Sequence, residues 1–148
     1  MKYMEKGVRK MENICIFCKI IGKEIPSTTL YEDDDFKVIM DISPAAKGHA
    51  IILTKKHFAN IFELDDDTAS KALVIAKKVA TALKEEFNCD GVNILQNNGE
   101  AAGQTVFHYH IHVIPRYYKD SVRITWGQDS YKDGEAEEIA KAIQKRII

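Results

Sequence analysis

The sequence predicts an α+β fold: an antiparallel sheet with one long helix packed on it and a short C-terminal helix. Short apolar runs between turn residues indicate strands, and one long segment has apolar residues at helical spacing. A chain of 148 residues that is 45% hydrophobic can bury one ordinary core, and it contains no internal repeat or linker. We therefore expect a mobile leader over residues 1–13 and a single domain over residues 14–148.

The first half of the chain predicts three strands. The segments TTLYE and FKVIMDI flank the acidic turn Asp33–Asp35, so they are expected to form a hairpin. HAIILTK, residues 49–55, predicts a third strand of the buried type. The earlier segment CIFCKII, residues 15–21, is too short and mixed to assign, and a turn follows it.

Residues from about Asp65 to Phe87 predict the long helix. Apolar side chains recur there at helical spacing, at Ala69, Ala72, Leu73, Ala76, Val79, Ala80, Leu83 and Phe87. Three acidic residues cap its start, and residues 88–91 end it. Two strands follow at residues 92–97 and 106–115, separated by a loop with two glycines, and residues 135–147 predict a terminal helix.

The charge balance and the cysteine count exclude several classes of protein. With 21 Lys and Arg against 22 Asp and Glu, the chain has no overall basic field that would bind a nucleic acid. It has no stretch near the roughly eighteen apolar residues of a membrane-spanning helix, and its N-terminus lacks a signal-peptide pattern. Three cysteines, an odd number, do not suit a disulfide framework, so we expect a location in the reducing cytoplasm.

Three histidines alternate with apolar residues in HYHIHVI, at His108, His110 and His112. Alternate residues of a strand point to opposite faces, so the three imidazoles share one face. The other face is apolar and is expected to pack against the long helix. The histidine face then forms the wall of a pocket.

The spacing of these histidines allows three interpretations. They could be an accidental polar face, or metal ligands, or catalytic groups. Histidines two apart on a strand lie about 6.6 Å apart, and the outer pair about 13 Å apart, while a zinc ligand nitrogen lies about 2.1 Å from the metal. Three of them therefore cannot ligate one ion, but two could, which leaves one free. A neutral imidazole can attack phosphorus.

HYHIHVI resembles the histidine triad motif. The segments CIFCKIIGKEIPS, DISPAAKGHAIILTKKH and the run from Asn97 through GQTV to Pro115 resemble further family segments in the same order, and together they cover about residues 15–116. On these motifs the chain is identified as a member of the histidine triad family, which implies the family's α+β fold.

The resemblance implies a two-step nucleotidyl transfer. The middle histidine, His110, would attack the α-phosphorus, with its other ring nitrogen held by a backbone carbonyl, and His112 would contact the phosphate. Gln104, Thr105 and Asn97 match family positions that contact the phosphate or the leaving group. Taken alone, Gln104 and Thr105 also fit ordinary turn capping.

The resemblance also implies a nucleoside pocket. Asp41 matches the acid that accepts hydrogen bonds from the ribose hydroxyls, although an Asp before Ile42 could simply form a turn. Phe17, Ile42 and Leu53 match base-pocket positions, and any of them could equally be core.

Cys15 and Cys18 have the CxxC spacing of half a zinc site. In several bacterial relatives such a pair joins two histidines around a structural zinc. Carried over to this chain, the ligands are Cys15, Cys18, His49 and His108, and His57 is the alternative fourth ligand. Other branches of the family lack the cysteines and keep the equivalent of His49 near the catalytic histidine.

Two classes of function follow from the resemblance. The first is an enzyme that hydrolyses purine nucleoside phosphoramidates or related AMP derivatives, with dinucleoside polyphosphate hydrolysis as the alternative. The second is a nucleotide-binding interaction module without essential turnover. An intact His110 favours the enzyme. The family also implies a homodimer joined through the long helix and the strand after it, with Trp126 reaching the partner's pocket, although a lone tryptophan also fits a simple packing role.

Overall fold

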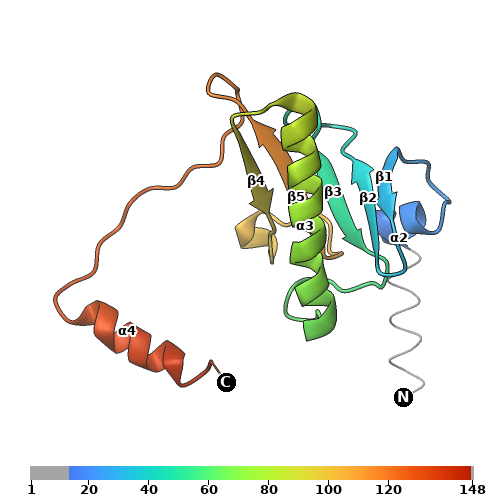
Figure 1. Cartoon of the computed structure of the whole chain (residues 1–148). Coiled ribbons are helices and arrows are strands. Elements are labelled where there is room, and N and C mark those ends of the chain that lie inside the picture. Colours follow the sequence, from blue (N-terminus) through green and yellow to red (C-terminus); the bar gives the residue numbers. More distant parts are fainter. Residues whose placement is uncertain (1–13, 148) are drawn as a thin grey trace, which may run out of the picture.

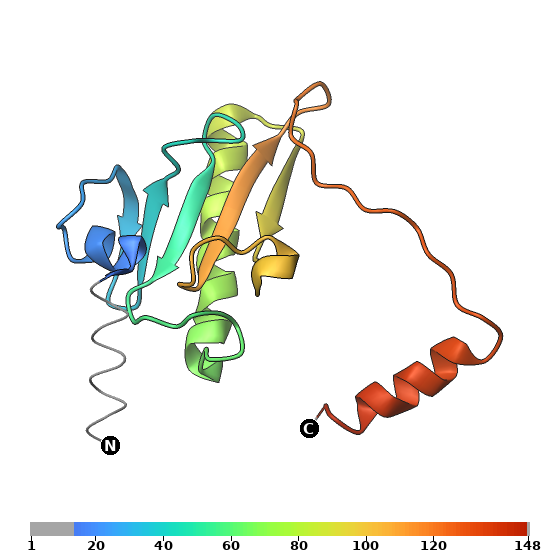
Figure 2. The ribbon, with the colours of Figure 1, turned by 180° about the vertical axis from the view of Figure 1, so that it is seen from behind.

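The computed structural model describes residues 14–147, so the leader expected at residues 1–13 lies outside the described residues. One antiparallel sheet has the strand order β1-β2-β3-β5-β4. The strands are β1 (Thr29–Glu32), β2 (Phe36–Met40), β3 (Ala50–Thr54), β4 (Gly91–Leu95) and β5 (His110–Arg116). The helices are α2 (Ile16–Ile21), α3 (Asp66–Phe87) and α4 (Glu135–Gln144), with a short 3-10 turn, η1 (Glu100–Ala102). The architecture confirms the expected α+β fold. Helices α3 and α2 lie on opposite faces of the sheet (Figures 1 and 2).

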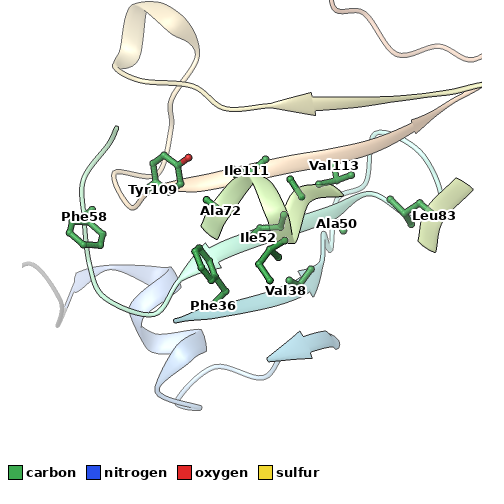
Figure 3. Close-up of a cluster of buried hydrophobic side chains, with 12 residues drawn as sticks. Phe36, Val38, Ala50, Ile52, Phe58, Ala72, Leu83, Tyr109, Ile111 and Val113 are labelled. Carbon is green, nitrogen blue, oxygen red and sulfur yellow. The ribbon is translucent and has the colours of Figure 1, made fainter. Parts of the chain in front are cut away.

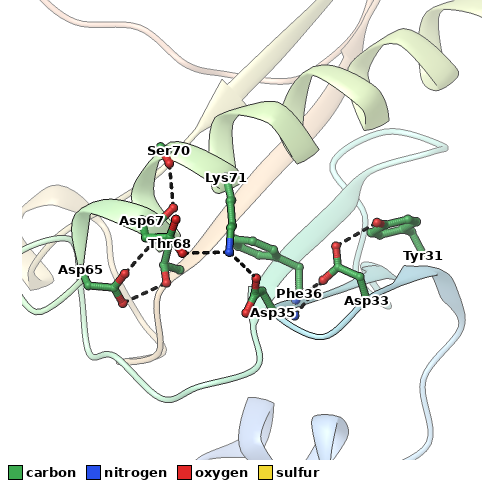
Figure 4. Close-up of polar contacts among 9 residues, drawn as sticks. All are labelled: Tyr31, Asp33, Asp35, Phe36, Asp65, Asp67, Thr68, Ser70 and Lys71. Atoms are coloured by element: carbon green, nitrogen blue, oxygen red, sulfur yellow. Dashed lines mark hydrogen bonds and ion pairs between the residues drawn. The ribbon is translucent and has the colours of Figure 1, made fainter.

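The acidic turn between β1 and β2 closes the hairpin that the sequence predicts. One carboxylate oxygen of Asp33 accepts hydrogen bonds from the backbone N–H groups of Asp35 (2.9 Å) and Phe36 (2.7 Å). Its other oxygen accepts one from the hydroxyl of Tyr31 at 2.8 Å (Figure 4). Aspartate is favoured in such turns because its short side chain can replace backbone acceptors.

Helix α3 begins and ends where its capping residues predict. The carboxylate of Asp65 accepts a hydrogen bond from the backbone N–H of Thr68 at 2.8 Å, and Asn88 ends the helix in the left-handed conformation (φ 46°). Lys71 forms ion pairs with Asp35 (2.9 Å) and Asp67 (2.8 Å), which connect the first turns of the helix to the β1–β2 hairpin (Figure 4).

The main core lies between α3 and the sheet. Its residues come from alternate positions of β2, β3 and β5 and from one stripe of α3 (Figure 3), and they include Phe36, Val38, Ala50, Ile52, Ala72, Ala76, Leu83, Ile111 and Val113. A smaller cluster lies on the other face under α2 and contains Cys15, Phe17, Ile20, Ile39, Ile51 and Leu53. Both faces of β3 are therefore covered, as a buried strand requires.

The structure differs from the sequence analysis in two segments. The segment 15–21, left unassigned from the sequence, is the short helix α2, in which the backbone N–H of Lys19 bonds to the carbonyl of Cys15 at 3.1 Å. Strand β5 begins at His110 and not at residue 106, so the expected strand over 106–115 is too long. The backbone N–H of Tyr109 bonds to the carbonyl of Phe58, in a loop, which removes this part of the chain from the sheet.

Beyond β5, the chain leaves the sheet as an extended arm, residues 121–133, and ends in α4 (Figures 1 and 2). This helix confirms the expected terminal helix, although it ends at Gln144, three residues before the expected end. None of the helices within residues 14–147 has the length and apolar character needed to cross a membrane.

Gly48 is expected to tolerate no side chain. It has φ +94°, and a Cβ atom there would lie 2.6 Å from a ring carbon of Phe87, at the end of α3. Gly48→Ala should therefore lower the free energy of unfolding by about 2 kcal/mol, measured by urea denaturation. Gly127→Ala is the control, because nothing lies within 4 Å of its added Cβ. Equal unfolding midpoints for the two variants would contradict this account.

Candidate active site

His110 and His112 lie on the face of β5 opposite α3, beside β3. In the antiparallel register His110 pairs with Leu53 and His112 pairs with Ile51. The two rings form an edge contact with centroids 5.0 Å apart, and the ring of Phe17 approaches His110 at the same centroid distance from α2. The strand alternation therefore places these two imidazoles on one face, as the sequence predicts.

The imidazole of His110 has a defined tautomer. Its Nδ1 lies 2.6 Å from the backbone carbonyl oxygen of His108. A carbonyl only accepts hydrogen bonds, so Nδ1 carries the hydrogen and Nε2 carries a lone pair whenever the ring is neutral. Burial lowers the pKa of His110 below its usual value, which favours the neutral ring at pH 7. Nε2 is therefore able to act as a nucleophile or a base.

His112 belongs to a chain of hydrogen bonds that starts at the backbone. The N–H of Ala45 donates to Nδ1 of His49 at 3.0 Å, so His49 carries its hydrogen on Nε2. That Nε2 lies 2.9 Å from Nδ1 of His112, which must then accept. The remaining nitrogen of a neutral His112, Nε2, is thereby fixed as a hydrogen-bond donor.

Asp41 lies at the edge of this group. Its carboxylate is 3.5 Å from Nε2 of His49, and its other oxygen accepts a hydrogen bond from the backbone N–H of Ser43 at 2.8 Å. Its backbone N–H donates to the carbonyl of His49 at 2.9 Å. The acid is thus both a turn residue and a partly exposed charge beside the histidines, and the two interpretations made from the sequence are compatible.

The titration of His112 predicts a loss of stability in acid. Burial, followed by the charges of His110 and His49, lowers the pKa of His112 to about 4, against about 6.5 in an unfolded chain. Below pH 6.5 the unfolded chain binds a proton that the folded chain does not, so the free energy of unfolding falls between pH 7 and pH 4, by about 3 kcal/mol at most. In urea denaturation His112→Asn should show a smaller pH dependence than the unchanged protein. Identical slopes would refute this assignment.

A second group of side chains lies where α2 meets the start of β5. It consists of Cys15, Cys18, His57 and His108, whose possible ligand atoms all lie within 4.8 Å of one another. The Nδ1 atom of His108 is 3.5 Å from each of the two sulfurs and 3.2 Å from Nδ1 of His57. Nδ1 of His57 is 3.3 Å from the sulfur of Cys18.

These four residues fit a tetrahedral zinc ion. Zinc bonds of about 2.0–2.3 Å give a tetrahedron whose edges are about 3.3–3.8 Å, close to the separations observed. Nε2 of His108 lies 2.7 Å from the carbonyl oxygen of Thr54, so it carries the hydrogen and leaves the Nδ1 lone pair facing the sulfurs. The two sulfurs and two imidazole nitrogens therefore converge as a possible set of four metal ligands.

His49 is not part of this cysteine group, contrary to the ligand set that the resemblance implied. It lies beside His112, further along β5 from His108, and the alternative, His57, occupies the place beside the cysteines. The antiparallel register explains the exchange: the first residue of β3, Ala50, pairs with Val113 in the middle of β5, whereas the chain after β3 lies near the start of β5. The hydrogen-bond chain through His49 was not predicted from the sequence.

The loop residues expected near the phosphate differ in their surroundings. Gln104 is buried, and its amide is fully engaged with backbone groups of Gly99, Ala59 and Val106. It therefore holds two loops together. Thr105 is exposed, and the side-chain amide of Asn97 reaches the carbonyl of Gly103 only at 3.5 Å.

The three residues expected in the base pocket are also unlike one another. Phe17 and Leu53 are buried in the cluster beneath α2, next to His110. Ile42 is 93% exposed, which leaves its whole side chain free to contact a ligand. The structure thus brings Phe17 and Leu53 to the histidines, while Ile42 lies at the rim with Asp41.

The chain is similar in sequence to proteins of one family. A family model described as the HIT domain matches residues 22–119. "Protein hit" of Bacillus subtilis is 44% identical over 136 residues, which cover 90% of this chain and 94% of that protein. The adenosine 5'-monophosphoramidase HNT1 of Saccharomyces cerevisiae is 43% identical over 117 residues, which cover 78% of this chain and 72% of that protein.

Solved structures agree with the sequence matches. The crystal structure of a member of the HIT family from Bacillus subtilis has a TM-score of 0.86 at 43% identity and covers 91% of this chain and 98% of its own. A Zn-bound histidine triad family protein from Mycobacterium smegmatis has a TM-score of 0.71 at 31% identity, over 90% of this chain and 96% of its own. The fold, the alternating histidines and the domain match together establish that the chain belongs to the histidine triad, or HIT-domain, family.

Proposed function

We propose that this chain is a nucleotide hydrolase that cleaves purine nucleoside phosphoramidates or related AMP derivatives through a nucleotidyl-histidine intermediate. One observation carries the proposal: the buried imidazole of His110 gives its Nδ1 hydrogen to the carbonyl of His108 and keeps a lone pair on Nε2. A relative named as an adenosine 5'-monophosphoramidase supports the choice of substrate.

In the first step Nε2 of His110 attacks the α-phosphorus. A P–N bond to His110 forms, the bond from phosphorus to the leaving group breaks, and the leaving group departs with the electron pair and takes up a proton from solvent. The ring becomes an imidazolium, whose charge the carbonyl oxygen of His108 stabilises through the Nδ1 hydrogen bond. The Nε2 hydrogen of His112 supplies a donor for the negative phosphoryl oxygens.

In the second step a water oxygen attacks phosphorus and the P–N bond breaks. The electron pair returns to Nε2 of His110, and the attacking water loses its proton to solvent. Because the hydrogen stays on Nδ1, the ring leaves phosphorus as a neutral imidazole and not as an anion, so the same carbonyl contact serves both steps. We assign ribose recognition to Asp41 and base packing to Phe17, Ile42 and Leu53, with Thr105 and Asn97 near the leaving group.

We also propose a structural zinc held by Cys15, Cys18, His57 and His108. When bound, such an ion supplies folding free energy by cross-linking α2 to the loops beside β5. His108 connects the two sites, because its side chain faces the cysteines while its backbone carbonyl orients His110. Because an odd number of cysteines suits a reducing compartment better than a disulfide framework, we place the protein in the cytoplasm, and we propose that it acts as a homodimer.

The substrate is tested by comparing kcat/KM for adenosine phosphoramidate, a diadenosine polyphosphate and an alkyl ester of AMP. We expect the phosphoramidate to give the largest value. A larger value for the dinucleotide would support the alternative, dinucleoside polyphosphate hydrolysis. If the protein binds AMP but hydrolyses none of the three compounds, the nucleotide-binding interaction module is the correct interpretation and the hydrolase is excluded.

His49 is proposed as a positioning residue that acts through His112. His49→Leu removes the donor to His112 and should lower kcat by about 10- to 100-fold with little change in KM, less than the loss expected for a direct phosphate donor. His49→Gln keeps an amide donor near the same point and should recover part of the loss. A purely structural role predicts no difference between the two variants once both are shown to be folded, so equal kcat values would exclude the relay.

A further inference from the structure

Helix α4 has an apolar stripe with nothing packed on it. The stripe consists of Ala136, Ile139, Ala140 and Ile143, and Ile147 follows three residues beyond the end of the helix. None of the 10 residues of α4 is buried, and Ile143 is 51% exposed. A helix of this length is not stable in water by itself, because packing of an amphipathic face supplies most helix stability in proteins. The stripe therefore needs a surface to cover it.

An apolar groove lies elsewhere on the molecule, beside the C-terminal half of α3. It has a volume of about 430 Å³, and α3, β1, β2 and the loop before β3 form its walls. Its lining includes Leu30, Met40, Val79, Ala82 and Phe87. Leu30 and Phe87 are 49% and 38% exposed, so the groove presents apolar surface to solvent.

The charges that border the groove match those that border the stripe. Lys78 and Glu86 both line the groove and lie about 12 Å apart along α3, while Glu137 lies in the first turn of α4 and Arg146 lies two residues beyond its end. If α4 lay parallel to α3 in the groove, Glu137 would face Lys78 and Arg146 would face Glu86, so the charges are complementary in sign. Within residues 14–147 none of these four side chains has an ion-pair partner.

The arm that carries α4 leaves the fold away from this groove. The guanidinium of Arg116 donates to Asp120, to Asn93 and to the carbonyl of Val122, which fixes the chain direction just beyond β5. This exit lies next to the edge strand β4, while the groove lies beyond α3 over β1 and β2. From the exit the arm runs outward past β4 (Figures 1 and 2).

We propose that α4 of each chain binds the apolar groove beside α3 of a second copy, so that two chains exchange their C-terminal arms. The inference gives the proposed homodimer a specific contact and does not depend on the reaction. Within one chain the apolar stripe of α4 and the groove beside α3 lie apart. An exchange of arms between two chains covers both of these apolar surfaces. Two grooves and two arms also satisfy the closed two-fold symmetry of a dimer.

Cysteine cross-linking of the full chain tests this contact. Ala82→Cys, in the groove, carries a purification tag, and Ala140→Cys, on the stripe, carries none. After mixing and mild oxidation, the proposal predicts a covalent product that contains one chain of each kind. The matched control replaces Ala82→Cys by Thr81→Cys, the neighbouring position on the opposite flank of α3, and the single variants report background from the native thiols.

A double variant with both cysteines distinguishes the copies. Exchange gives a product of two chain masses, whereas a cross-link within one chain shows that the arm folds back on its own groove and overturns the proposal. Equal yields for Ala82→Cys and Thr81→Cys, or no product above background, also overturn it, even where sedimentation shows that the dimer itself persists.

The contribution of the stripe to dimerisation is measured with two adjacent substitutions. Ile143→Asp places a charge in the stripe of both arms and should weaken dimerisation by at least about 100-fold in sedimentation equilibrium. Ala142→Asp adds the same charge on the other side of α4 and should change it little. Equal effects of the two substitutions would contradict the docking of this face.

Discussion

Replacing His110 by alanine should abolish turnover while leaving nucleotide binding nearly unchanged. The side chain supplies the attacking atom, so we expect kcat to fall by at least about 10⁴-fold. Binding of AMP, measured by calorimetry, should stay within a few-fold, because Asp41 and the apolar pocket remain. His112→Ala should retain more activity, with a loss of about 10²- to 10³-fold, since it removes a phosphate donor and not the nucleophile.

The control for the His110 variant is His110→Asn, which keeps a polar side chain in the buried position next to Phe17. Both variants should unfold at urea concentrations close to that of the unchanged protein. Full activity in His110→Ala, with the fold intact, would return the site to the rival interpretation made from the sequence, in which a metal-activated water attacks.

Replacing both Cys15 and Cys18 by serine should remove the proposed zinc and destabilise the fold. Elemental analysis of protein purified without added metal should find about one zinc per chain, and none in the double variant. Because binding free energy becomes folding free energy, we expect the double variant to lose at least about 3 kcal/mol of stability. Its kcat should also fall, since the His108 carbonyl that orients His110 loses its support.

Cys89→Ala is the matched control for the cysteine pair. Cys89 is buried but lies outside the group of possible ligands, so this variant should keep its zinc even where packing costs some stability. Zinc-free protein with reduced cysteines, full stability and full activity would show that the cysteine group has no structural metal. Replacement of His57, and not of His49, should also lower the zinc content.

Much of the fold follows from local patterns in the sequence. The acidic turn, the capping residue Asp65 and the helical spacing up to Phe87 each act over a few residues, and the structure has the hairpin and the helix where they indicate. The alternation of His110 and His112 with apolar residues also suffices to place both rings on one face, because the strand period is two. These features need no information from distant parts of the chain.

Two predictions from the sequence were wrong, the placement of His49 beside the cysteines and the start of β5, and both features depend on contacts between distant segments. His49 and His57 both flank β3, and only the antiparallel pairing of β3 with β5 decides that His49 meets His112 while His57 meets His108. The alternation of His49 with Ile51 and Leu53 was a signal that could have placed His49 on the histidine face. The start of β5 could not be read locally, because it depends on a hydrogen bond from Tyr109 to a distant loop.

The central claim is that His110 carries the nucleotide during turnover, and a quench experiment tests it directly. The protein is mixed with adenosine phosphoramidate labelled at phosphorus, quenched in alkali during the first turnovers, and digested for peptide mapping. A phosphorus–nitrogen bond to histidine survives alkali and is lost in acid. We therefore expect alkali-stable, acid-labile label on the peptide that contains His110, and no label on the His110→Ala protein. Turnover by the unchanged protein with no label on any peptide, or with label on a residue other than His110, would contradict it.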